Sequence, residues 1–157
     1  MKKIVLLLII IAGSFLTSQL YSQTNLGVRL GGWSGYGAEI SYQGPIGSGN
    51  RLEADLGIRA GDGYSGFSLV GIYQWTFPLE DGFGWYVGPG ASLGVWSYDD
   101  VTSDDDGFFL GVNGQIGLEY NFTFPIQLSV DYRPGISITG GGWFNDFGLG
   151  IRWRFGG

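Results

Sequence analysis

The chain is 157 residues long and carries 8 basic against 14 acidic residues, with no histidine and no cysteine. Charged residues make up only 14% of it, against roughly 25% in an ordinary soluble domain, while 31 positions are glycine and 17% are aromatic. So many aromatics with so few charges exclude a disordered chain. The lack of cysteine excludes disulfides and thiolate metal sites, and the length suits one domain.

The first segment has the pattern of a secretory signal peptide. Lys2 and Lys3 precede an apolar run from Ile4 to Ala12, and small and polar residues follow it. The run is too short for a transmembrane helix, which needs about 20 apolar residues. We therefore expect residues 1–22 to be a signal peptide and residues 23–157 to form the mature domain. The mature domain would keep six arginines and 14 acidic residues, a balance that argues against nucleic-acid binding.

Beyond the signal segment, apolar residues recur with a period of two, which predicts β-strands. In chain order the alternating runs cover about 25–32, 37–43, 51–60, 66–77, 85–98, 110–122, 126–138 and 146–155. Segments rich in glycine, proline or aspartate separate the runs and predict turns. The sequence therefore predicts an all-β domain of eight antiparallel strands joined up and down, with both termini at the same end.

The run at 51–60 shows the alternation most clearly. Leu52, Leu56 and Ile58 lie on one face, and Glu53 and Asp55 lie on the other with two arginines. An eight-stranded sheet of this kind closes into a barrel, because closure removes its edges. Two barrels fit the pattern: a soluble barrel with an apolar interior, or a transmembrane β-barrel whose apolar face meets lipid.

The polar face favours the transmembrane barrel. It is rich in glycine, which suits the narrow lumen of an eight-stranded barrel. Its charges balance, as enclosed charges must, since an unpaired buried charge costs several kcal/mol. The remaining eight acidic residues fall in predicted turns. The predicted lumen charge network consists of six arginines and six carboxylates: Arg29, Glu39, Arg51, Glu53, Asp55, Arg59, Glu119, Asp131, Arg133, Asp146, Arg152 and Arg154.

Aromatic residues of the apolar face gather towards the strand ends, as in the girdles of transmembrane barrels. One predicted rim carries Tyr42, Trp75, Phe77, Trp85, Tyr120, Phe122, Trp153 and Phe155. The other carries Trp33, Tyr36, Tyr64, Trp96, Tyr98, Phe108 and Trp143. The strands also have the length of about 9–11 residues that spans a bilayer with tilt.

Over nearly all of the mature length, the chain resembles the small eight-stranded outer-membrane barrels of the OmpA/OmpX type. Its closing strand resembles the signal read by the barrel-assembly machinery, a glycine followed by spaced aromatics, at Gly150, Trp153 and Phe155. Family members typically end on the aromatic, whereas two glycines follow it here. The resemblance implies a monomer in the outer membrane of a Gram-negative bacterium. Its partners would be outer-membrane lipid, lipopolysaccharide and the barrel-assembly machinery.

The sequence offers little catalytic chemistry. Outer-membrane phospholipases, lipid A acyltransferases, lipid A deacylases and omptin proteases resemble this architecture but place a histidine at the active site, and this chain has none. Both lysines lie in the predicted signal peptide, so no other strong base remains. We expect no enzymatic activity, no catalytic residue and no cofactor.

One acidic segment is a candidate cation site. Carboxylates bind Ca²⁺ and Mg²⁺, but the spacing of a dedicated loop such as an EF-hand is missing, so a solvated acidic loop is the favoured interpretation. The weak candidate ligands are Asp99, Asp100, Asp104, Asp105 and Asp106.

The function we expect is a structural or surface-interaction role for a barrel with a largely plugged polar lumen. Two alternatives stay open. One is a narrow pore for ions or very small solutes, because the interior glycines leave some room. The other is a soluble periplasmic barrel that binds an apolar ligand, with the two faces reversed.

Overall fold

The computed structural model describes residues 23–31, 37–61, 63–98 and 107–156. For residues 59–61, 64 and 98 it describes the backbone alone. The predicted signal peptide, residues 1–22, lies outside the described part of the chain. No helix among the described residues is long and apolar enough to cross a membrane.

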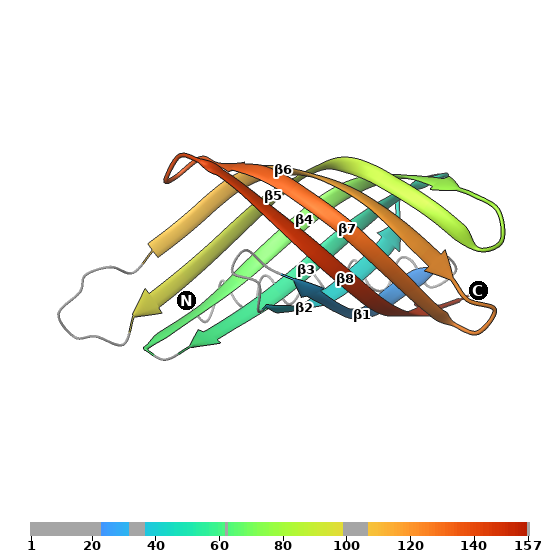
Figure 1. The fold of residues 1–157 in the computed structure, drawn as a ribbon, viewed down its shortest axis with the longest axis horizontal. Coiled ribbons are helices and arrows are strands. Elements are labelled where there is room, and N and C mark those ends of the chain that lie inside the picture. Colours follow the sequence, from blue (N-terminus) through green and yellow to red (C-terminus); the bar gives the residue numbers. More distant parts are fainter. Residues whose placement is uncertain (1–22, 32–36, 62, 99–106, 157) are drawn as a thin grey trace.

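Eight antiparallel strands form a single closed barrel in which each strand pairs with its neighbours in sequence (Figure 1). This confirms the predicted fold class. The strands are β1 (Thr24–Gly31), β2 (Ala38–Pro45), β3 (Asn50–Gly61), β4 (Tyr64–Pro78), β5 (Phe83–Tyr98), β6 (Gly107–Asn121), β7 (Ile126–Ser137) and β8 (Trp143–Phe155). The last strand begins three residues before the alternating run that predicted it.

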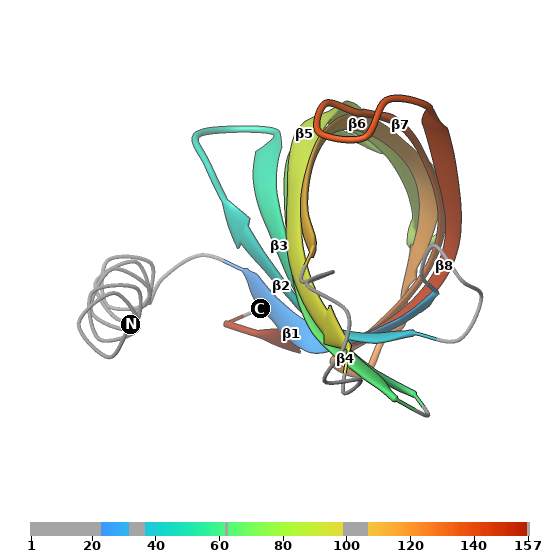
Figure 2. The same cartoon turned by 90° about the vertical axis from the view of Figure 1, so that its left-hand side faces the viewer.

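The first and last strands close the barrel. They pair from Thr24 with Phe155 to Gly31 with Gly148. The paired residues of successive strands can be followed once around the barrel, from β1 back to β1. The circuit ends about ten residues along β1 from its starting residue. This shift in register means that the strands tilt strongly relative to the barrel axis, as Figure 1 shows. Figure 2 looks along the barrel from one end. A barrel of eight strands has an interior that side chains just fill.

The two ends of the barrel differ. The turn end, as we name it, carries the start of β1, the end of β8 and the three short connections at 46–49, 79–82 and 122–125. The connection after β4 turns through Asp81 and Gly82, whose φ angles are 55° and 85°. Such angles are costly for most residues but easy for glycine and tolerable for aspartate. The opposite end is the loop end.

The two faces of the wall have the polarity of a membrane barrel. Arg29, Glu53 and Arg152 point inwards and are fully buried, whereas Ile58 and Leu118 point outwards and are 66% and 54% exposed. Large apolar side chains are exposed in this way on all eight strands. The soluble barrel with reversed faces is therefore wrong, because it would bury the apolar side chains and expose the charged ones, and the structure has the opposite arrangement.

The aromatic rim predicted for the turn end is confirmed, since seven of its eight members lie on the exterior face of their strands and Phe122, in the connection after β6, packs against Tyr120. At the loop end, Phe108 and Trp143 also face outwards. Trp96 is a correction: it shares the interior face of β5 with Tyr86 and Ser92, and a Cβ at Gly107 would overlap its ring. Trp33 and Tyr36 lie outside the described residues, as do the side chains of Tyr64 and Tyr98.

Candidate functional site

The interior of the barrel gathers most of its charged side chains into one network. Arg29 on β1 lies at one side of it, fully buried. Its Nη2 is 2.6 Å from Asp131 Oδ1, and its Nη1 is 2.9 Å from Glu39 Oε2 and 2.8 Å from Asp146 Oδ2. A Cβ at Gly148 would overlap this guanidinium group. The glycine therefore makes the room in which Arg29 joins β1 to β2, β7 and β8.

Arg133 on β7 continues the network across the lumen. Its Nη2 donates to Glu53 Oε1 at 2.6 Å and also pairs with Asp55, and its Nη1 is 3.3 Å from Glu39 Oε2. Glu39 thus contacts both Arg29 and Arg133. Because β7 lies across the barrel from the adjacent strands β2 and β3, these contacts cross the interior.

Glu53 on β3 accepts hydrogen bonds from four side chains. Its Oε1 accepts from Arg133 and, at 2.9 Å, from Gln115, while its Oε2 accepts from Gln43 at 2.5 Å and from Arg152 at 3.1 Å. Each oxygen of this buried carboxylate therefore accepts two hydrogen bonds, and these bonds offset the free-energy cost of removing the charge from water.

Arg152 on β8 is held at all three of its nitrogens. Besides the contact with Glu53, its Nε donates to Ser41 Oγ at 2.8 Å and its Nη1 to Ser129 Oγ at 2.7 Å. A Cβ at Gly150, two residues earlier on the same strand, would overlap Ser129 Oγ. Gly150, which the sequence singles out for the assembly signal, therefore also makes room beside this arginine.

A smaller cluster surrounds Arg51 on β3. Its Nη2 is 2.7 Å from Glu119 Oε2, its Nε donates to Gln74 Oε1 at 2.6 Å, and its Cζ lies 5.0 Å from the centre of the Tyr86 ring. Gln74 donates in turn to Gln115, which binds Glu53. Two glutamines thus link the smaller cluster to the main network.

Among the predicted lumen residues whose side chains the structure describes, ten form these ion pairs and Arg154 does not. Arg154 is a correction, because its Nη2 donates to the backbone carbonyls of Phe122 at 2.6 Å and Phe124 at 3.3 Å, at the turn end. Backbone carbonyls in a turn do not pair with a neighbouring strand, and the Arg154 guanidinium supplies hydrogen-bond donors to them.

The side chain of Arg59 lies outside the described residues. Within the described part of the main network, three arginines face five carboxylates: Glu39, Glu53, Asp55, Asp131 and Asp146.

The predicted network contained only charged residues and therefore left out several uncharged interior side chains. Ser41, Gln43, Gln74 and Gln115 are buried and complete the network. For Ser41, Gln43 and Gln115 the available signal was an even spacing from a charged residue of the same strand, whereas the strand of Gln74 has no charged residue. Tyr86 is also fully buried and lies where a Cβ at Gly117 would overlap its ring.

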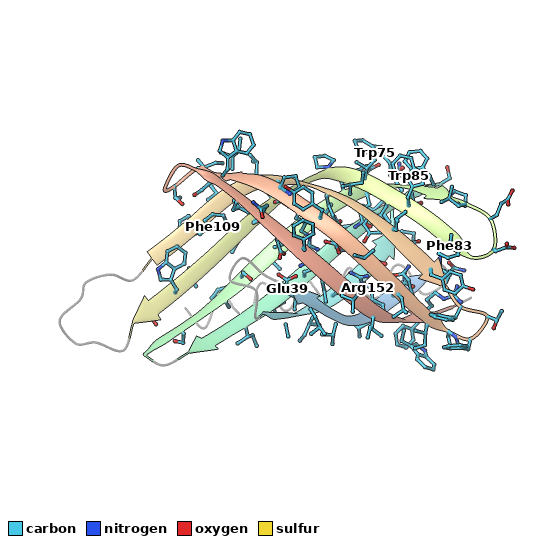
Figure 3. The ribbon with its side chains drawn as sticks, in the orientation of Figure 1. Glu39, Trp75, Phe83, Trp85, Phe109 and Arg152 are labelled. Carbon is cyan, nitrogen blue, oxygen red and sulfur yellow. The ribbon has the colours of Figure 1, made fainter. Side chains whose placement is uncertain are left out.

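The interior towards the loop end contains an aromatic pair. Phe109 and Phe144 form an aromatic pair with ring centres 5.4 Å apart and planes inclined at 75°. A Cβ at Gly135 would overlap the Phe144 ring, and one at Gly111 would crowd both rings. Figure 3 shows Phe109 nearer the loop end than Glu39 and Arg152. The interior therefore holds a charged network and, nearer the loop end, this aromatic pair.

The other sequence candidates fare differently. Trp153 and Phe155 of the expected assembly signal lie on the exterior of β8, towards the turn end. The acidic segment with Asp99, Asp100, Asp104, Asp105 and Asp106 lies outside the described residues. Within the described ranges, no group of three or more acidic side chains is arranged to hold a metal ion.

Comparison with known proteins agrees with this architecture. Neisserial surface protein A is 21% identical, with a TM-score of 0.60 over 86% of this chain and 96% of that one. The N-terminal β-barrel domain of Pseudomonas aeruginosa OprF is 16% identical, with a TM-score of 0.66 over 85% of this chain and 98% of that one. At these identities the likeness concerns the fold. No curated protein sequence matches the chain.

The family described as "Outer membrane protein beta-barrel domain" matches residues 11–155, nearly the whole chain. The exposed apolar wall and the charged interior are what a barrel needs in order to sit in lipid. The chain therefore belongs to the outer-membrane β-barrel domain family, and its location is the outer membrane.

Proposed function

We propose that this outer-membrane barrel has a structural or surface-interaction role and that its lumen is largely plugged. The observation that carries the proposal is the position of Glu53, which binds Arg133 on β7 and Arg152 on β8 from β3. An ion crossing the lumen would have to separate such pairs. Separating buried ion pairs leaves charges without partners in the interior, which is costly, so the network opposes the passage of an ion.

A narrow pore for ions or very small solutes is the second candidate. It is favoured by buried polar atoms that have no protein partner within the described structure: Asn25 Oδ1, Asp55 Oδ1, Tyr86 Oη, Asn113 Nδ2 and Gln127 Oε1. Buried polar groups of this kind normally bind water. They come from β1, β3, β5, β6 and β7, so water would be distributed through the interior.

The proposal includes the absence of enzymatic activity. The sequence has no histidine, and the buried carboxylates that the structure describes are engaged by arginines or glutamines. A carboxylate held in this way is a poor general base, because protonating it would break its ion pairs. Incubation with labelled lipid and labelled peptide tests this part, and turnover of either one contradicts it.

Biogenesis and partners belong to the same proposal. Residues 1–22 would be removed as a signal peptide, and the mature monomer would be inserted by the barrel-assembly machinery through Gly150, Trp153 and Phe155. Lipopolysaccharide would surround the outer part of the wall. N-terminal sequencing of protein extracted from outer membranes tests the first point, with a start near residue 23 expected.

Single-channel recording in planar bilayers tests the plug. Purified protein of confirmed insertion should show no steady conductance in 1 M salt. A constant open level in every insertion would contradict the plugged lumen and favour the narrow pore. An unheated and a boiled sample on an SDS gel provide the control, because a folded barrel changes mobility on boiling.

A further inference from the structure

The apolar surface of the barrel continues past the strands at the turn end. Ile46, Leu79 and Phe124 each lie in one of the three short turns and are 42%, 53% and 54% exposed. Each of the three turns thus presents at least one large apolar side chain to the surroundings. Exposed apolar groups that recur around a rim indicate a contact surface.

A ladder of aromatic rings connects this rim to the lipid-facing wall. Phe83 and Tyr120 have ring centres 4.6 Å apart, Tyr120 and Phe122 are 4.7 Å apart, and Phe122 and Phe124 are stacked at 4.8 Å. Tyr120 lies on the exterior face of β6, and Phe124 lies in the turn beyond it. The rim is therefore continuous with the surface that meets lipid (Figure 3, where Phe83 marks this end).

The turns hold these side chains outwards. Arg154 donates to the carbonyls of Phe122 and Phe124, and the Ile126 amide donates to the Phe124 carbonyl at 2.7 Å. The Leu79 amide donates to the Phe83 carbonyl at 2.8 Å. With the backbone fixed at both positions, Leu79 and Phe124 project from the rim as part of the fold.

The charged residues of the described rim indicate which kind of phospholipid headgroup it would contact. Glu80 and Asp81 follow Leu79 directly and are both exposed. The guanidinium of Arg154 already contacts backbone carbonyls. The rim thus offers carboxylates to the surroundings, which suits the ammonium group of a zwitterionic phospholipid better than the phosphate of an anionic one.

We propose that the turn end is a lipid-docking rim. Short turns of outer-membrane barrels face the periplasm, so the leaflet concerned is the phospholipid leaflet on that side. Ile46, Leu79 and Phe124 insert into its headgroup layer, and Glu80 and Asp81 contact ammonium headgroups. The barrel is thereby fixed in depth by its turns as well as by its strands.

Single-cysteine labelling tests the insertion, because the natural sequence contains no cysteine. The variants Ile46→Cys, Leu79→Cys and Phe124→Cys would each carry a polarity-sensitive fluorophore in phosphatidylethanolamine–phosphatidylcholine vesicles. The matched control is Ser48→Cys, an exposed polar position in the same turn as Ile46. We expect acrylamide in the water to quench the three rim positions at least threefold less than position 48. Equal quenching at all four positions would overturn the proposal.

Two further measurements distinguish a zwitterionic phospholipid from an anionic phospholipid and from a protein partner. Protection of the rim should weaken in phosphatidylglycerol vesicles, and the double variant Glu80→Gln/Asp81→Asn should remove this dependence on lipid charge. Stronger protection in the anionic vesicles would overturn the headgroup assignment. If the rim were open to acrylamide in vesicles but protected in isolated outer membranes, a periplasmic protein would be the occupant and lipid docking would be wrong. The gel shift on boiling shows that each variant has assembled.

Discussion

Glu53 on β3 and Arg152 on β8 meet at 3.1 Å inside the barrel, although 99 residues separate them in the sequence. Neither strand pairs with the other, so the contact crosses the lumen. The same carboxylate also binds Arg133 on β7. This one side chain therefore ties three separate parts of the wall together, and it leads to the first prediction.

Replacing Glu53 by alanine should destabilise the barrel by about 3–5 kcal/mol, because Arg133 and Arg152 would lose a shared buried partner. Urea unfolding in lipid vesicles, followed by tryptophan fluorescence, measures the change. The control is Glu119→Ala, whose pair with Arg51 is less deeply buried and should cost less. If both variants lost the same free energy of unfolding, the contacts of Glu53 across the lumen would contribute no more stability than the pair of Glu119 with Arg51.

A charge on the lipid-facing wall should be costly. Leu56 lies on the exterior near the middle of β3, so Leu56→Arg should cost about 2–4 kcal/mol and impair assembly. The amount of heat-modifiable barrel in isolated outer membranes measures this effect. If the variant assembled as well as the wild-type protein, the assignment of Leu56 to the lipid-facing surface would be wrong.

Two glycines make a matched pair for testing how tightly the lumen is filled. Gly148→Ala should cost about 1–3 kcal/mol, because its Cβ would overlap the Arg29 guanidinium. Gly71→Ala should be neutral or stabilising by up to about 1 kcal/mol, since a Cβ at that exterior position has nothing within 4 Å. Unfolding midpoints of both variants check the contrast. A larger loss at Gly71 would mean that glycine acts here through the backbone rather than through space.

The charged network, rather than the aromatic pair, should set the conductance. Glu53→Ala combined with Arg152→Ala should produce steady single-channel openings, because the contact across the lumen is then lost. Phe144→Ala leaves the network in place and should stay closed. If Phe144→Ala showed openings and the double variant did not, the aromatic pair at the loop end would be the barrier to ions.

Sequence reasoning reached the wall of the barrel because its signal is local. Side chains of a strand alternate between two faces, so Leu56 and Ile58 against Glu53 and Asp55 define the faces of β3 without any knowledge of its partners. Where glycines alternate with aromatics the signal is weak. Neither kind of residue marks a face by polarity, and this is why Trp96 of β5 was assigned to the exterior.

The sequence by itself determined that eight strands close into a barrel and favoured an apolar exterior, since period-two alternation and charge balance are properties of the chain. Only the tertiary structure decided which charges meet. Arg29 pairs with Asp131, 102 residues away, while Arg154, two residues beyond Arg152, turns to the backbone of the neighbouring turn. The physical reason is the combination of register and strand tilt, which sets the height of each side chain in the lumen and depends on all eight pairings together.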